Sequence, residues 1–152
     1  MTSRPDQVPE RLLAKASWLV KEVAVYAGRL SHEGFAAAGA RPYWYPLLAA
    51  LDEFGPSSQA DLGRRCGIDR SDVVAAVSAM ADAEYVRRTE DRVDRRRNVI
   101  TLTTAGEREL RALDGHLAAV QEALLEPLDG AEREQLVRLL QRVRAHQRDR
   151  VS

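Results

Sequence analysis

Two short helical segments separated by a three-residue turn constrain the fold of this chain more than any other feature. Ser58 is placed as an N-cap, with Asp61 as its reciprocal partner, ahead of a helix of about two turns that Gly67 ends. Asp69 can cap the next helix, which runs from Arg70 to about Ala83. Because a glycine-bearing turn sets two helices at a steep angle, this spacing predicts a helix-turn-helix.

Helical patterns precede this motif. Apolar residues recur every three or four positions and predict one long amphipathic helix from about Pro9 to Ala38, ended by Gly39. A second helix is expected to open at Arg41 and Pro42 and to end before Gly55, with Pro46 in its first turn.

A hairpin and two helices are expected after the motif. Residues 85–89 and 99–103 are rich in β-branched or strand-forming residues and flank a charged tip. Leucines from Leu110 to Leu124 then follow a coiled-coil-like spacing, and Pro127 and Gly130 break this helix. The last helix is expected to fray from Arg148 onward. The order predicts a mainly α protein with a small β-hairpin wing, that is, a winged helix-turn-helix.

Composition excludes several classes of protein. With 152 residues, 45% hydrophobic and 30% charged, the chain fits one globular domain, residues 1–152. It has no apolar run of the roughly 20 residues that a membrane span needs and no signal-peptide core, so we expect a cytoplasmic protein without a membrane partner. The single cysteine, Cys66, cannot form an internal disulfide and is expected to pack in the core.

Catalytic and cofactor signatures are also missing from the sequence. We find no glycine-rich phosphate loop, nucleophile elbow or HExxH motif, so neither an enzyme nor a catalytic residue is predicted. The three histidines, His32, His116 and His146, lie far apart, so no metal site or cofactor is expected.

Charge is balanced over the chain but concentrated at the hairpin tip. The 23 basic and 23 acidic residues cancel, which leaves no global field to attract a polyanion. Residues 92–97, however, contain four arginines and one aspartate, Asp94. Such a cluster can contact phosphates locally.

The sequence resembles the MarR family of bacterial transcriptional regulators over nearly its whole length. The resemblance is carried by residues 58–62 and 67–71, and by Asp94, Arg95 and Arg96 leading into the LTTAG segment at 102–106. It implies a homodimer that pairs through residues 1–40 and 104–148, and a DNA-binding lobe at 41–103. The helix that runs from Arg70 to about Ala83 would enter a major groove, and the wing would enter the adjacent minor groove.

The helix from Arg70 has an apolar face and a face of small side chains. At roughly 100° per residue, Val73, Ala76, Val77 and Met80 fall together and are expected to pack inward. The opposite, small face consists of Ser71, Ala75, Ser78 and Asp82, with Asp72 and Val74 at its flanks. Relatives commonly have longer polar residues near 74 and 75, so here direct readout would depend on Arg70 or the serines, with Val74 or Ala75 available for a thymine methyl group.

The wing arginines are the other candidates for DNA contact. Arg95 and Arg96 are suited to a narrow minor groove, with Asp94 bracing one of them. The alternatives without DNA contact are that the small face of the helix from Arg70 is simply solvated, and that the hairpin tip is simply an exposed polar turn. The full set of candidate DNA contacts is Ser58, Arg70, Ser71, Asp72, Val74, Ala75, Ser78, Arg92, Asp94, Arg95, Arg96 and Arg97.

Aromatic residues mark a candidate effector site where the first two helices are expected to face one another. Proteins that resemble this family often hold a small aromatic or anionic effector there. The candidates are Trp18, Tyr26, Tyr43, Trp44 and Tyr45, with Arg29 and His32 available for a carboxylate. The alternative is that these aromatics form the core or a dimer contact.

The sequence therefore predicts a sequence-specific, effector-responsive regulator that binds double-stranded DNA as a homodimer on a pseudo-palindromic operator. Apolar surface along Leu12–Leu30 and Leu110–Leu124 supports dimerisation, since one small wing domain cannot cover it. The alternative function is a winged-helix module that binds protein instead of DNA.

Overall fold

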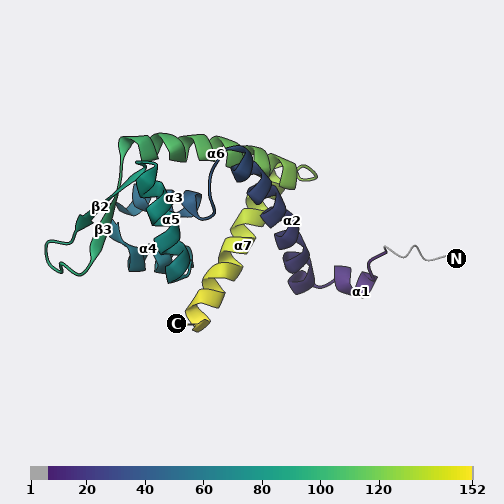
Figure 1. The fold of residues 1–152 in the computed structure, drawn as a ribbon. Coiled ribbons are helices and arrows are strands. Elements are labelled where there is room, and N and C mark those ends of the chain that lie inside the picture. Colours follow the sequence, from purple (N-terminus) through teal and green to yellow (C-terminus); the bar gives the residue numbers. More distant parts are fainter. Residues whose placement is uncertain (1–6, 152) are drawn as a thin grey trace.

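The computed structural model describes residues 7–151 and is mainly helical, with a small sheet at one end (Figure 1). The long helix α6 spans the molecule. A lobe of three helices and the wing lies at its first end, and α2 and α7 extend from its other end (Figure 1). The elements are α1 (Glu10–Leu13), α2 (Ala16–Ala37), α3 (Trp44–Phe54), β1 (Ser57–Ser58), α4 (Gln59–Cys66), α5 (Arg70–Asp82), β2 (Val86–Glu90), β3 (Asn98–Leu102), α6 (Thr104–Leu124) and α7 (Gly130–Val151).

The prediction of one helix from Pro9 to Ala38 is wrong. Lys15 adopts extended backbone (φ −110°, ψ 111°) and separates α1 from α2. The apolar spacing continues across this break, from Leu12 to Ala16 and Leu19, so periodicity alone could not reveal it.

The next helix, α3, begins three residues later than expected. Tyr43 precedes it in the left-handed region (φ 69°), and the helix starts at Trp44. Pro46 is tolerated because it occupies the first turn, where a backbone N–H has no helical acceptor. Gly55 ends α3 as predicted, with φ 74°.

The helix-turn-helix is confirmed, with one difference in its caps. The N–H of Asp61 donates to Ser58 Oγ (3.1 Å), and Gly67, at φ 66°, ends α4. Asp69 occupies the N-cap position of α5, but its side chain makes no cap hydrogen bond there. The predicted capping role of that carboxylate is therefore wrong, because Asp69 is exposed and turned toward solvent.

The wing contains one more strand than the sequence predicts. The antiparallel order is β1-β3-β2, with Ser57 opposite Ile100 and Val86 opposite Leu102. Two residues of β1 are too few to show any alternation, so only its pairing with β3 defines it as a strand. This pairing attaches the wing to the start of α4.

One apolar core joins the lobe to α6. Val73, Ala76, Val77 and Met80 of α5 are buried in it, as predicted. The core also contains Leu47, Leu48, Leu62, Ile100, Leu110 and Leu113. Leu110, Leu113 and Val120 of the predicted dimer seam are buried within the chain, so that part of the dimer argument is wrong.

Helix α2 packs along α6 and α7 is largely uncovered. A Cβ on Gly34 of α2 would lie 2.8 Å from Val120 Cγ2, which shows how closely α2 and α6 approach. Asp129 and Glu132 form a reciprocal capping box at the start of α7 (2.9 and 3.0 Å). The helix then continues to Val151 instead of fraying from Arg148. None of the helices among residues 7–151 is long and apolar enough to span a membrane.

Candidate nucleic-acid interface

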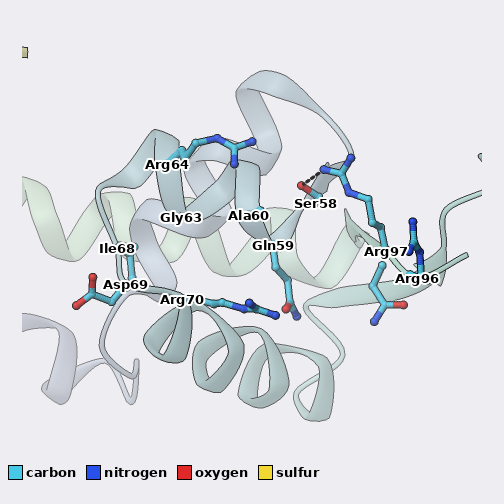
Figure 2. Close-up of a pocket in the computed structure, with 11 residues that line it drawn as sticks. Ser58, Gln59, Ala60, Gly63, Arg64, Ile68, Asp69, Arg70, Arg96 and Arg97 are labelled. Carbon is cyan, nitrogen blue, oxygen red and sulfur yellow. Dashed lines mark hydrogen bonds between the residues drawn. The ribbon is translucent and has the colours of Figure 1, made fainter. Parts of the chain in front are cut away.

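An open groove of about 680 Å³ separates α4 and the start of α5 from the base of the wing (Figure 2). Its polar lining includes Ser58, Gln59, Arg64, Arg70, Arg96, Arg97 and Asn98. Asp69 also lines the groove, but Figure 2 shows its carboxylate pointing away from the Arg70 guanidinium, which extends toward Gln59. Four arginines against this single lining carboxylate make the groove basic.

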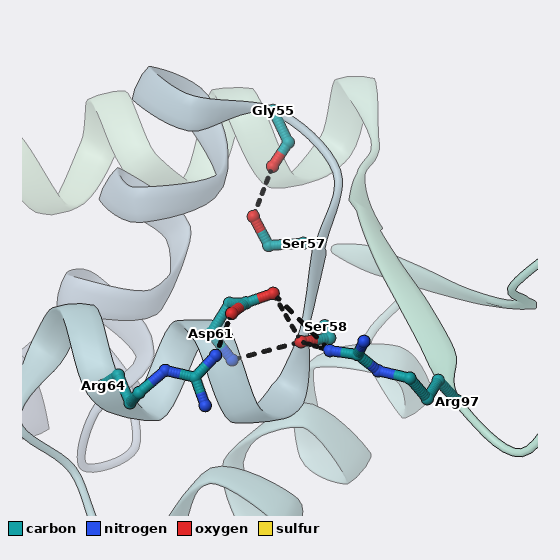
Figure 3. A network of polar contacts seen from close by, with 6 residues as sticks. All are labelled: Gly55, Ser57, Ser58, Asp61, Arg64 and Arg97. Atoms are coloured by element: carbon teal, nitrogen blue, oxygen red, sulfur yellow. Dashed lines mark hydrogen bonds and ion pairs between the residues drawn. The ribbon is translucent and has the colours of Figure 1, made fainter. Parts of the chain in front are cut away.

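A polar network ties the wing base to α4 (Figure 3). Arg97 Nη2 donates to Ser58 Oγ (3.2 Å) and lies 3.9 Å from Asp61 Oδ2. The Ser58 hydroxyl donates to the same oxygen (2.7 Å), and Arg64 forms an ion pair with Asp61 Oδ1. The Ser58 hydrogen bond, followed by the charges of Arg64 and Arg97, lowers the pKa of Asp61.

At the wing tip Asp94 braces Arg96, one of the two arginines for which this was predicted. Asp94 Oδ1 accepts the backbone N–H of Arg96 (3.1 Å) and its Nε–H (3.2 Å). The Arg97 N–H donates to the Asp94 carbonyl oxygen (2.9 Å) and closes the turn. The Arg96 side chain remains 91% exposed, and Arg92 and Arg95 are also exposed, so all three point their charge to solvent.

The outward face of α5 is as small as predicted, but a neighbouring strand adds a long side chain to it. Ser71, Ala75 and Ser78 are exposed, and Val74 is 43% exposed, while Asp72 is half-buried. Arg88 Nη2, from β2, donates to Ser78 Oγ (2.7 Å).

Sequence reasoning missed Arg88, and it also missed Gln59 and Arg64. The alternation of β2 could have identified Arg88, because a period of two puts it on the same face as the buried Val86. No comparable local signal distinguishes Gln59 or Arg64 from other exposed residues of a short helix.

The predicted effector residues do not form one cluster in the structure. Trp44 is buried in the lobe and meets Tyr85 edge-on, with ring centroids 5.4 Å apart. Tyr45 stacks on Phe35 (5.7 Å) and donates its hydroxyl to Asp114 Oδ1 (2.8 Å). Burial, and then this hydrogen bond, raise the pKa of Tyr45.

The other effector candidates are spread along α2 and the turn after it. Tyr26 and Tyr43 are 55% and 42% exposed, Arg29 and His32 are exposed, and Trp18 is half-buried. The expected face-to-face packing of the first two helices is wrong, because α2 packs along α6 and reaches α3 at Phe35.

Cys66 is half-buried at the end of α4. Its thiol donates to the Pro46 carbonyl oxygen (3.4 Å), and burial raises its pKa despite an opposing effect of Arg65. The Arg65 guanidinium lies over the Phe54 ring, 4.2 Å from its centroid. Within residues 7–151, no three histidine, cysteine, aspartate or glutamate side chains are grouped to hold a metal ion.

Three helices, an antiparallel wing and a basic groove between them define a winged helix-turn-helix protein. Residues 40–97 match the sequence model of the MarR family. YxaD of Bacillus subtilis, an uncharacterised HTH-type transcriptional regulator, is 31% identical over 99 residues, which cover 65% of this chain and 69% of YxaD. The chain therefore belongs to the MarR family, and the resemblance seen in the sequence is confirmed.

Other relatives agree with this assignment. The transcriptional repressor NicR of Pseudomonas putida is 30% identical over 99 residues, 65% of this chain but only 63% of NicR, which is less than two thirds of that protein. A probable transcriptional regulator from Pseudomonas aeruginosa superimposes with a TM-score of 0.75 at 26% identity, over 87% of this chain and 98% of the other.

A more distant solved structure has the same fold. It is a structure of BpsR from Bordetella bronchiseptica, a protein whose DNA binding is regulated by 6-hydroxynicotinic acid. It superimposes with a TM-score of 0.74 at 19% identity, over 86% of this chain and 93% of BpsR.

Proposed function

We propose that this chain is a transcriptional regulator that binds double-stranded DNA sequence-specifically. The observation that carries this proposal is the basic groove between α4, α5 and the wing base. Arginine guanidinium groups match phosphate oxygens in a bidentate geometry, and a B-DNA major groove, about 12 Å wide, admits one α-helix. A helix presented beside an arginine-lined groove fits both requirements.

Three groups of residues would make different contacts. Ser58, Arg64 and Arg97, which surround the groove, would bind phosphates. The exposed side of α5, with Arg70, Ser71, Asp72, Val74, Ala75 and Ser78, would meet base edges, and Arg88 would add a long donor beside Ser78. Arg95 and Arg96 would enter the minor groove, with Arg92 and Asp94 completing the wing tip.

A homodimer would complete the binding unit. Outside the lobe, α2 exposes Val20, Val23 and Val25 to 54%, 48% and 56%, and α7 exposes Val143 to 59%. Apolar surface of this extent on two long helices is typical of an interface between subunits. A two-fold dimer would present two α5 helices to half-sites about one helical turn apart.

A small aromatic acid is the effector class that we propose. BpsR, whose DNA binding is regulated by 6-hydroxynicotinic acid, has the same fold. In this chain Arg29 and His32 lie three positions apart on one side of α2 and are exposed, so both offer nitrogen donors to a ligand carboxylate. The buried Trp44 Nε1 has no hydrogen-bond partner within the described part of the chain, which leaves a donor for a ligand oxygen.

Selection of bound sites from random DNA duplexes, combined with light scattering, tests the proposal. We expect a pseudo-palindromic site, a dimeric mass, and affinity that falls steeply as salt rises, because each neutralised phosphate releases counterions. A protein-binding winged helix would instead show little DNA affinity at any salt concentration. That result would overturn the proposed function.

A further inference from the structure

We propose that Asp61 limits the affinity of this protein for DNA by holding Arg64 and Arg97 in ion pairs that a DNA phosphate has to displace. This inference rests on the proposed function. It assigns to an acidic residue beside the groove a role opposite to that of the two arginines with which it pairs.

Asp61 does not itself line the groove, but both of its carboxylate oxygens contact residues that do (Figure 3). Oδ1 pairs with Arg64, one turn further along α4. Oδ2 accepts the Ser58 hydroxyl at 2.7 Å and lies 3.9 Å from Arg97 Nη2. One carboxylate therefore engages two of the four arginines that line the groove.

All three charged groups remain accessible to a bound polyanion. The side chains of Arg64, Arg97 and Asp61 are 69%, 49% and 39% exposed. A phosphate approaching the groove can therefore reach both guanidinium groups. In contrast, Arg70 and Arg95 carry no ion pair or side-chain hydrogen bond with any residue of the described range 7–151.

The competition follows from the chemistry of the two anions. A carboxylate and a phosphate both accept charge-assisted hydrogen bonds from arginine, so an arginine paired with Asp61 has to exchange partners when DNA binds. An exposed ion pair contributes little to stability, so the exchange is possible but has a cost.

A substitution that removes the negative charge of Asp61 but keeps the shape of its side chain can test this role without removing the helix cap. Ser58 Oγ caps α4 by accepting the backbone N–H of residue 61, which Asp61→Asn retains. The amide oxygen of the new side chain can still accept the Ser58 hydroxyl. Glu126→Gln is the matched control, because it removes the same charge from an exposed residue in the turn after α6, at the end of that helix away from the wing (Figure 1).

The assay measures binding of each full-length variant to a mixed-sequence duplex of about 30 base pairs over a range of salt concentrations. We expect Asp61→Asn to bind about two- to fivefold more tightly, the range that corresponds to releasing an exposed ion pair. The slope of log affinity against log salt should steepen by about 0.9 for each arginine that newly contacts a phosphate. Glu126→Gln should change neither quantity by as much.

A second pair of variants identifies the cause of any gain. Asp61→Asn is introduced into a protein that already carries Arg64→Ala and Arg97→Ala, and the gain should then be largely abolished. An undiminished gain in this background, an equal gain for Glu126→Gln, or no tightening at all would overturn the inference. Absence of duplex binding by the wild-type protein at low salt would instead refute the proposed function, and this inference with it.

Discussion

Gly106 lies in the first turn of α6, at the point where this helix meets the beginning of the wing. A Cβ at this position would lie 2.1 Å from the Tyr85 carbonyl oxygen and 2.7 Å from Leu102 Cδ1. The carbonyl is held in place because it accepts the Thr103 N–H at 3.1 Å. The Thr103 hydroxyl also donates to the Glu84 carbonyl (2.6 Å) and accepts the Gly106 N–H (3.0 Å).

These contacts set the cost of replacing Gly106 by alanine. An ordinary Cβ contact begins at 3.4 Å, so the carbonyl and the new methyl group have to separate by about 1.3 Å, the difference between 3.4 and 2.1 Å. Overpacking of this kind costs about 1 to 3 kcal/mol, and a hydrogen-bonded backbone atom places the cost near the upper end. The better helix propensity of alanine offsets up to about 1 kcal/mol. We therefore expect Gly106→Ala to lower the free energy of unfolding by about 2 kcal/mol.

Urea unfolding followed by circular dichroism, at one fixed protein concentration, measures this change. Gly115→Ala is the matched control, since a Cβ at Gly115 of the same helix meets nothing within 4 Å. The control should stabilise the protein by about 0.5 to 1 kcal/mol. The reasoning is refuted if Gly106→Ala is as stable as the control variant.

Three further predictions concern other parts of the molecule. Alanine at Arg95 or Arg96 should weaken binding to all DNA sequences and reduce the slope of log affinity against log salt by about one for each phosphate that the protein no longer neutralises. Arg70→Ala should instead change the preference at particular base pairs by roughly 1 to 3 kcal/mol. Binding of each variant to selected and scrambled duplexes at several salt concentrations measures both effects, and the same behaviour in the wing variants and in Arg70→Ala would contradict this division of roles. Cys66 should remain a thiol at neutral pH, because burial raises its pKa. The buried neutral thiol therefore stabilises the fold at low pH, and this stabilisation is lost as pH rises through the raised pKa. Rapid labelling of the native protein by a thiol reagent at pH 7 would disprove this. Tyr45→Phe should destabilise the protein by about 0.5 to 1.5 kcal/mol because the hydrogen bond to α6 is removed, and an unchanged urea midpoint would count against that bond.

The local elements of the fold could be predicted from the sequence. The cap at Ser58 and the stop at Gly67 defined α4, and the spacing of Val73, Val77 and Met80 identified the buried face of α5. These signals depend on residues three or four positions apart, and the physics of caps and helix periodicity acts over that distance. The bracing of a wing arginine by Asp94 was predictable for the same reason.

The candidate interface could be predicted only in part. The sequence placed Arg95, Arg96 and Arg97 in one exposed cluster, because they are neighbours in the chain. It could not show that Arg97 reaches Ser58, which is 39 residues away, or that Arg88 reaches Ser78 across the gap between strand and helix. Pairs of this kind form only when two segments have already packed together.

The partners of apolar faces were also decided by the tertiary structure. The leucine spacing determined that α6 has an apolar seam, but not whether the chain itself or a second subunit would cover it. Leu110 and Leu113 are covered by the lobe, and Val120 lies against Gly34 of α2. A hydrophobic stripe records how much apolar surface a helix has to remove from water, whereas the identity of its partner depends on which distant segments the completed fold brings against it.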